Sequence, residues 1–301
     1  MAGAPAAVGS VQNDRGEALS LYTWEPVGLG RGVCVLFHGY GAHARYPTVQ
    51  FAADVLCAAG LRAYCADMPG HGASAGTPGL LPTVECVSKD GVAVTEHVRR
   101  LHPDLRLFLC GTSMGGAIAL NVSRLTVVDG VVLLAPMVKQ SAANVPAAPV
   151  LSILRFLSWV CPSLAVISPN AMDDDIQYTD PERRELCRSD QASCYHGKMR
   201  LGTAATLLDI SLDLHAHLEE ISCPFWVGMG GREVVVDPSG ATDLFERAAV
   251  ASEDKVLRTY PTAQHGLLAE PEPLRGEIER DITEWLRSRL DLPRRLRAQQ
   301  P

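Results

Sequence analysis

The stretch LRLFLCGTSMGGAIALNVSRL, residues 105–125, decides the fold that this sequence predicts. It begins as an apolar run of strand length and ends as a helical segment, and between them Gly111, Ser113 and Gly115 spell Gly-x-Ser-x-Gly. A serine on a sharp strand-to-helix turn exposes its hydroxyl, and the flanking glycines remove Cβ atoms that would clash in the turn. The helix behind it directs its positive end towards an anion that develops there. Ser113 is therefore predicted to be a nucleophile.

The same pattern occurs a second time in GASAG (72–76), around Ser74. Pro69, Gly70 and Pro78 make its surroundings a loop, with no strand before it and no helix after it. Ser74 is therefore predicted to have a structural role, bonded to nearby backbone.

The strands predicted around Ser113 are apolar along almost their whole length. An alternating strand has one face in water, whereas a continuous one is buried on both faces, as in a parallel sheet covered by helices. Helical segments separate these strands, and the alternation favours an α/β fold with a mostly parallel, doubly wound sheet. The runs lie at 32–37, 61–67, 105–110, 130–136, 223–230 and 255–261.

Residues 138–218 interrupt this alternation with helical or irregular segments. We interpret them as a cap inserted into a core that comprises 11–137 and 219–292. The Ala/Gly/Pro-rich residues 1–10 are predicted to be disordered, and 293–301 form a C-terminal tail.

The bulk composition narrows the class of protein. The chain of 301 residues has a net charge of −7 and one short basic run, at 294–297, so a nucleic-acid partner is not expected. Its nine cysteines are odd in number and scattered, which favours a reducing compartment over a disulfide framework. No signal peptide and no apolar run of membrane-spanning length are recognisable, so we expect a cytoplasmic protein.

An ester-cleaving serine needs N–H donors for the oxyanion that forms during the reaction. One is the amide of Met114, directly after Ser113. The segment VLFHGYG (35–41) is a buried strand followed by a loop, and it offers the amide of Tyr40 as the second donor. His38 in this loop is predicted to be structural, because the site needs a backbone donor there.

The general base is expected on the loop after the last strand, since the acid and then the histidine follow the serine in this arrangement. Among nine histidines only His265, in YPTAQHGLL, has that position. His215 and His217 lie earlier and two residues apart, on different sides of a helix, so they form neither a base nor a metal-binding pair. No metal or cofactor is predicted.

Two carboxylates compete for the place of the acid in GREVVVDPSGA (231–241). Asp237 precedes Pro238 and a helical run, which is typical of a helix N-cap and gives it a structural role. Glu233 follows the strand directly, where a carboxylate can orient His265 and stabilise its imidazolium form. Glu233 is predicted to be the acid, and Asp237 is the alternative.

In this order the motifs resemble those of the monoacylglycerol lipases, above all their plant-type branch, which includes lysophospholipase-like and caffeoylshikimate-esterase-like members. The similarity covers roughly residues 14–290. It implies an α/β-hydrolase fold with Ser113 as nucleophile, His265 as base, and the amides of Tyr40 and Met114 as the oxyanion hole. The motifs include FHGYG, CADMPGHGAS, GTSMGGAIAL, GKMRLGTAATLL and SEDKVLRTYPTAQH.

The chain departs from the family pattern at two places. Glu233 stands where the family has aspartate, so either the glutamate takes over its role or Asp237 does. In HGYGAHARY, Arg45 matches an arginine that contacts the glycerol end in animal monoacylglycerol lipases, but Ala42 stands where an acid is expected. Arg45 and the neighbouring His43 are predicted to contact substrate.

Residues 150–160 of the predicted cap are apolar on almost every side of a helix. Burial against the core is one explanation. A helix above a site has less core to pack against, so the alternative is an exposed patch for a fatty chain or a bilayer surface. Leu154 and Trp159 are predicted to contact substrate.

Together these features predict a serine ester hydrolase that acts on monoacylglycerol or lysolipid esters through an acyl-enzyme. Its expected partner is a small ester, with peripheral membrane contact through the cap as an additional hypothesis. A caffeoylshikimate-type esterase or an acyltransferase would use the same triad. A non-catalytic binding protein of the same fold is the remaining alternative.

Overall fold

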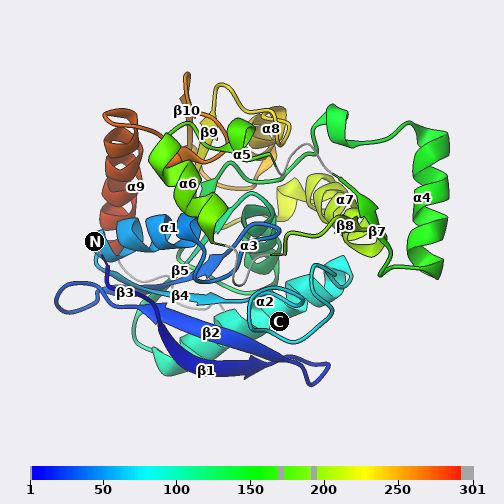
Figure 1. Ribbon diagram of the computed structural model, residues 1–301. Coiled ribbons are helices and arrows are strands. Elements are labelled where there is room, and N and C mark those ends of the chain that lie inside the picture. The colour runs from blue at the N-terminus through cyan, green and yellow to red at the C-terminus, as the bar shows by residue number, and fades with distance from the viewer. Residues whose placement is uncertain (1, 169–172, 191–194, 293–301) are drawn as a thin grey trace.

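The computed structural model describes residues 2–168, 173–190 and 195–292. Its centre is one eight-stranded sheet, whose strands lie side by side in this order: β1 (Ala6–Gln12), β2 (Ala18–Trp24), β4 (Leu61–Ala66), β3 (Gly32–Phe37), β5 (Arg106–Thr112), β6 (Gly130–Leu134), β9 (Phe225–Gly230) and β10 (Lys255–Tyr260). The last six strands in this order, β4, β3, β5, β6, β9 and β10, are parallel to one another, and β2 is antiparallel to both β1 and β4 (Figure 1). The predicted, mostly parallel sheet is confirmed.

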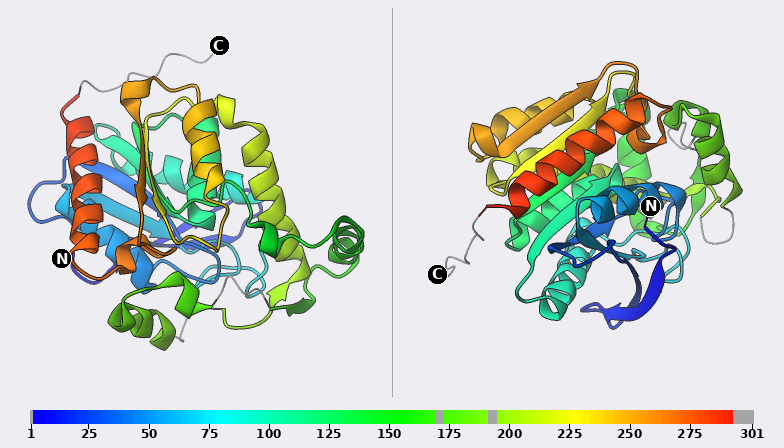
Figure 2. Two further views of the ribbon diagram at one scale, coloured as in Figure 1. Left: turned by 90° about the horizontal axis from the view of Figure 1, so that it is seen from above. Right: turned by 90° about the vertical axis from the view of Figure 1, so that its left-hand side faces the viewer.

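Helices cover both faces of the sheet (Figure 2). One face packs against α1 (Pro47–Ala58) and α9 (Leu274–Leu290), and the other against α2 (Val84–Leu101), α3 (Met114–Leu125), α7 (Leu201–Ala216) and α8 (Ser239–Arg247). All residues of β3, β6 and β9 are buried, because successive side chains enter the two layers alternately. In β3, Val33 and Val35 join one layer, while Cys34 and Leu36 join the other. This arrangement explains the continuous apolar runs.

The N-terminus is better ordered than its composition suggests. The prediction that residues 1–10 are disordered is wrong from Ala6 onward, since β1 pairs with β2. β1 is an edge strand whose residues are nearly all exposed, so small residues suffice there and no apolar pattern announces it. An ion pair of 2.7 Å between Arg15 and the fully buried carboxylate of Asp90 fastens the hairpin to α2. The predicted tail, 293–301, lies outside the described residues.

The insertion between β6 and α7 carries α4 (Ala148–Val160), α5 (Asp174–Gln177) and α6 (Pro181–Ser189), together with a two-stranded sheet of β7 (Ala165–Ile167) and β8 (Met199–Arg200). The predicted C-terminal boundary of the cap, residue 218, lies too far along the chain, because Ile210 and Leu214 of α7 belong to the core layer beside α3. Helical periodicity alone could not separate a core helix from a cap helix. Turns of 3₁₀ helix lie at Ala142–Asn144, Leu218–Glu220, Ser252–Asp254 and Leu267–Ala269.

Within the described residues, no helix combines the length and the apolar character that crossing a membrane requires. The eight cysteines in the same part of the chain are free thiols.

Candidate active site

Ser113 sits on a sharp turn between β5 and α3. Its backbone has φ 55° and ψ −120°, a left-handed conformation that a residue with a side chain rarely adopts. Such a conformation costs about 1–3 kcal/mol and persists only where the surroundings enforce it. Here the Ser113 amide donates to the carbonyl of Leu134 at 3.0 Å, and the Ser113 carbonyl accepts from the amide of Met137 at 3.0 Å. The turn is therefore held by β6 and by the loop that follows it.

The two glycines of the Gly-x-Ser-x-Gly pattern are there because the backbone leaves no room for a side chain. A Cβ on Gly111 would overlap the carbonyl of Gly115, and a Cβ on Gly115 would overlap the carbonyl of Phe37 at the end of β3. Gly115 thus allows α3 to begin directly against the loop that carries Tyr40. The pattern is a packing requirement of this turn.

Ser74, in the second match to the pattern, has the predicted structural role. Its hydroxyl donates to the carbonyl of Asp67 at 2.6 Å and accepts from the amide of Ser20 at 2.8 Å. It joins a loop to β2.

His265 and Glu233 form a buried, hydrogen-bonded pair. The Nδ1 of His265 lies 2.7 Å from Oε2 of Glu233, which makes Nδ1–H the donor and leaves Nε2 for the cavity side. The other carboxylate oxygen, Oε1, accepts from the amides of Val235 at 2.7 Å and Val236 at 3.2 Å. Burial raises the pKa of Glu233, but the facing imidazole and these two amides outweigh it, so its pKa lies below the usual value. Glu233 is an ionised partner for the imidazole at neutral pH.

Asp237 is engaged elsewhere. Its Oδ1 accepts from the amide of Ser239 at the start of α8, and its Oδ2 lies 3.3 Å from the ammonium group of Lys139. Burial raises the pKa of Asp237 and these contacts lower it, with a net decrease. The structure brings Glu233, and not Asp237, to His265.

The loop after β3 packs against the serine turn. A Cβ on Gly39 would lie 3.8 Å from the Cβ of Ser113, and the next amide along the chain is that of Tyr40. Met114 is the first residue of α3, where the initial N–H groups have no acceptor within the helix. His38 is structural as predicted: its Nε2 accepts from the amide of Met68 at 3.0 Å, and burial lowers its pKa to about 4.

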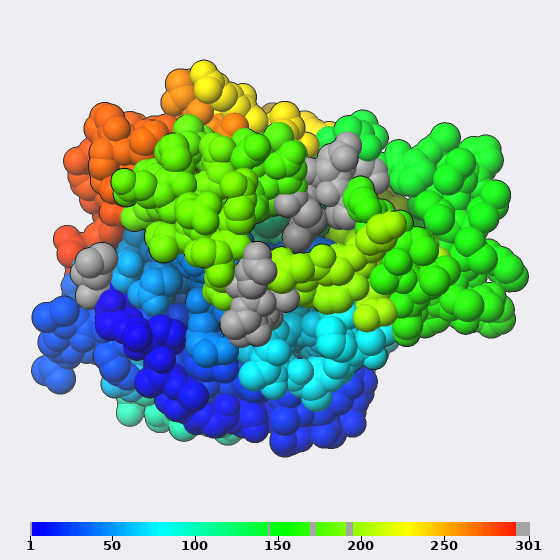
Figure 3. Space-filling model, in the orientation of Figure 1, coloured from blue at the N-terminus to red at the C-terminus, as the bar shows by residue number. Residues whose placement is uncertain are grey.

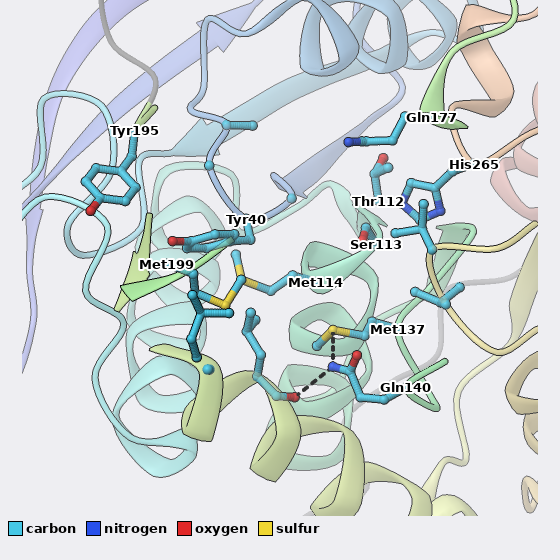
Figure 4. A pocket seen from close by; sticks show the side chains of 18 of the residues that line it. Tyr40, Thr112, Ser113, Met114, Met137, Gln140, Gln177, Tyr195, Met199 and His265 are labelled. Atoms are coloured by element: carbon cyan, nitrogen blue, oxygen red, sulfur yellow. Dashed lines mark hydrogen bonds between the residues drawn. The ribbon is translucent and has the colours of Figure 1, made fainter. Parts of the chain in front are cut away.

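Ser113 and His265 line one cavity of about 740 Å³ between the core and the cap, a volume in the range of small-molecule sites. Figure 4 shows the imidazole next to the serine, with Gln177 of the cap on the same side. Tyr40 and Met114 line the cavity too. Elsewhere its wall is largely apolar, with side chains that include Met137, Leu151, Leu154, Met199, Leu207 and Leu208.

The predicted substrate contacts are only partly placed in this cavity. Leu154 lines it, whereas Trp159 is 80% exposed on the outer side of α4. His43 and Arg45 do not line it. His43 is buried with Nε2 3.3 Å from the carboxylate of Asp190, and burial lowers its pKa. Arg45 is exposed, and its guanidinium lies over the ring of the buried Tyr22. Neither of the two residues lines the cavity, although Ala42 and Tyr46 on either side of them do.

Sequence reasoning missed the cap residues that close the cavity, above all Gln177, Tyr178 and Met199. Their positions depend on how the insertion folds back over the sheet. The similarity of GKMRLGTAATLL to the family was the one signal that could have marked Met199. In the described residues, no group of three or more His, Cys, Asp or Glu side chains could hold a metal ion.

Comparison with known proteins places this geometry among hydrolases. The family model described as serine aminopeptidase, S33, matches residues 30–272. A monoacylglycerol lipase of Mycolicibacterium smegmatis is 31% identical, with 89% of this chain and 92% of that protein covered. A caffeoylshikimate esterase of Arabidopsis thaliana is 27% identical, with 85% and 77% covered. The crystal structure of a monoacylglycerol lipase from Paleococcus ferrophilus superposes with a TM-score of 0.76 at 25% identity, over 90% of this chain and 99% of that one.

Proposed function

The chain belongs to this serine aminopeptidase S33 family of α/β-hydrolases, and from that premise we propose that it is a serine ester hydrolase that cleaves monoacylglycerols. One observation carries the proposal: a buried Glu233–His265 pair stands beside a strained Ser113 on the wall of a largely apolar cavity. This is the arrangement that activates a hydroxyl for attack on a carbonyl. The resemblance inferred from the sequence motifs is confirmed by the family match.

The reaction proceeds through an acyl-enzyme. The Oγ of Ser113 attacks the ester carbonyl while Nε2 of His265 takes its proton, and the resulting oxyanion accepts hydrogen bonds from the amides of Tyr40 and Met114. When the tetrahedral intermediate collapses, the bond to the alcohol breaks and His265 gives the alcohol its proton. Water, deprotonated by His265, then attacks the acyl group and releases the fatty acid. Ser113 regains its proton, and no metal or cofactor takes part.

Glu233 orients the base and stabilises its charged form. Its hydrogen bond to Nδ1 selects the tautomer that leaves Nε2 free to take the proton of Ser113. The amides of Val235 and Val236 hold the carboxylate through its other oxygen. The family's aspartate is therefore replaced here by a glutamate anchored on its own loop.

The apolar wall supports a fatty acyl chain as the part of the substrate that the cavity receives. The outer side of α4 supports contact with a lipid surface. Ile153, Phe156 and Trp159 are exposed on this helix, which stands out from the molecule in the space-filling view (Figure 3). Exposed aromatic and aliphatic side chains of this kind enter the interfacial region of a bilayer.

A second candidate substrate is a hydroxycinnamoyl ester. The similarity to the Arabidopsis caffeoylshikimate esterase supports it, as do the rings of Tyr40 and Tyr195, which line the cavity and are able to pack against an aromatic acyl group.

Hydrolysis of 1-monoolein, lysophosphatidylcholine, caffeoyl shikimate and p-nitrophenyl butyrate by the purified chain tests the proposal, with Ser113→Ala as the blank. We expect 1-monoolein to have the highest kcat/KM, and a fluorophosphonate to label wild type but not Ser113→Ala. A wild-type protein that stays unlabelled, in a tube where a known esterase reacts, would make the chain a non-catalytic binding protein. A higher kcat/KM for caffeoyl shikimate would assign the second candidate.

A further inference from the structure

The loop that carries His265 is bonded to the cap as well as to the core. The amide of Gly266 donates to the carbonyl of Gln177 at 2.7 Å, and the amide of Asp180 donates to the carbonyl of Ala269 at 3.1 Å. The side chain of Arg183 donates to the carbonyl of Leu268. The cap segment 177–183 thus runs along the loop and binds it through main-chain groups and through the side chain of Arg183.

A buried carboxylate closes this contact beside the base. Glu270 is 1% exposed, and its Oε1 accepts from the amide of Gln264 at 2.7 Å and from the hydroxyl of Thr179 at 2.8 Å. Gln264 directly precedes His265. One oxygen atom therefore connects the cap to the residue that precedes the base.

Packing makes the connection stiff. A Cβ on Gly266 would come within 2.5 Å of the ring of Tyr178, so the cap side chain lies directly on the backbone that follows His265. Tyr178, Cys187 and Ala269 form a small buried cluster of their own. The loop is unable to shift towards the cap without displacing this cluster.

We propose that Thr179 and Glu270 are positioning residues that set His265 from the cap, an inference that rests on the function proposed above. Gln177 and Tyr178 line the cavity next to this contact, so a substrate that packs against them acts on the same segment that holds the base. The cap then has two roles: it encloses the acyl chain, and it fixes the imidazole at the distance needed for proton transfer. A displacement of about 1 Å at such a group is enough to lower a rate by roughly 10²-fold.

Removal of the Thr179 hydroxyl tests the proposal. In Thr179→Val the size of the side chain is kept and the donor to Glu270 is lost, whereas Thr179→Ser restores the donor. Thr126→Val is the matched control, because Thr126 is also half-buried and donates its hydroxyl to a glutamate, Glu96, between α2 and α3. The measurements are kcat and KM for p-nitrophenyl butyrate, the rate of labelling by a fluorophosphonate, and the urea midpoint.

We expect kcat and the labelling rate of Thr179→Val to fall about tenfold while KM stays within twofold. Thr179→Ser and Thr126→Val should keep the wild-type values. Thr179→Ala, which lacks the hydroxyl but adds no bulky side chain, should show the same loss as Thr179→Val, and this separates the lost hydrogen bond from an effect of valine on the packing. If the hydrogen bond between Thr179 and Glu270 serves stability alone, Thr179→Val will lower the urea midpoint and keep kcat at the level of Thr126→Val. That result would overturn the inference. Wild-type protein that neither labels nor hydrolyses the ester would overturn the proposed function, and this inference with it.

Discussion

Two apolar helices of similar length, α3 and α4, have opposite surroundings. Nine of the twelve residues of α3 are buried, because the helix is enclosed by the sheet, α2 and α7. None of the thirteen residues of α4 is buried, and an ion pair between Arg155 and Asp209 of α7 is a polar contact that holds it. Burial depends on what a helix packs against, and apolar content alone does not decide it. The apolar residues of α3 stabilise the fold, whereas those of α4 remain available to a ligand or a lipid surface.

The largest expected effect is on catalysis in the core, at Glu233, the carboxylate bonded to His265. We expect Glu233→Gln to lower kcat by about 10³- to 10⁴-fold, since an amide no longer stabilises the imidazolium and permits the wrong tautomer. Asp237→Asn is the matched change in the same loop and should stay within about threefold, because Asp237 bonds to Ser239 and Lys139. Steady-state kinetics with p-nitrophenyl butyrate measure both variants. Full activity in Glu233→Gln together with a large loss in Asp237→Asn would exchange their roles.

The next largest expected effect is a difference in the free energy of unfolding between alanine variants of α3 and of α4. Leu120 of α3 is fully buried, so Leu120→Ala should lower the free energy of unfolding by about 2–5 kcal/mol. Ile153 of α4 is 60% exposed, and Ile153→Ala should stay within about 0.5 kcal/mol of wild type. Urea unfolding followed by circular dichroism measures both changes. Equal losses in the two variants would mean that α4 packs in solution against a surface that covers it.

The sequence predicted the core well because the chemistry there is local and repetitive. A strand buried on both faces must be apolar throughout, and the serine turn leaves no space at Gly111 and Gly115, so both features are written in short patterns. The pairing of Glu233 with His265 was also predictable, because both follow parallel strands, β9 and β10, whose carboxyl ends meet at one edge of the sheet.

The cap was predicted poorly because its positions depend on contacts between distant segments. Nothing in the residues around Thr179 indicates that this segment runs along the His265 loop. His43 and Arg45 lie close in sequence to Tyr40, but their side chains contact Asp190 and Tyr22 and do not line the cavity. The edge strand β1 was not predicted, because an exposed strand needs no apolar pattern.

A smaller effect is expected when the exposed side of α4 is changed. If α4 contacts lipid as proposed, Trp159→Ala should leave hydrolysis of soluble p-nitrophenyl butyrate unchanged and lower the rate on 1-monoolein in phosphatidylcholine vesicles several-fold, because the side chain is exposed and does not line the cavity. Leu154→Ala, on the cavity side of the same helix, should reduce the rate on monoolein in both vesicles and detergent micelles. Equal losses of Trp159→Ala on the soluble and the vesicle substrate would place this side chain at the site itself.

The smallest expected effects are on the pH dependence of stability. Ionisation of a carboxyl group in the core stabilises the fold, whereas ionisation of one in the cap destabilises it. The pKa of Glu233 lies below its usual value of 4.5, so its ionisation stabilises the fold above that pH, and this contribution is lost as the pH falls through the lower folded pKa. Burial raises the pKa of Asp174 in the cap, more than the nearby Arg188 lowers it, so its ionised form destabilises the fold at neutral pH. This cost disappears as the pH falls through the unfolded value of about 3.9. We therefore expect Glu233→Gln to lower the urea midpoint at pH 7 and Asp174→Asn to raise it slightly. Both differences from wild type should narrow as the pH approaches 4, and a shift of the same sign in the two variants would contradict this assignment.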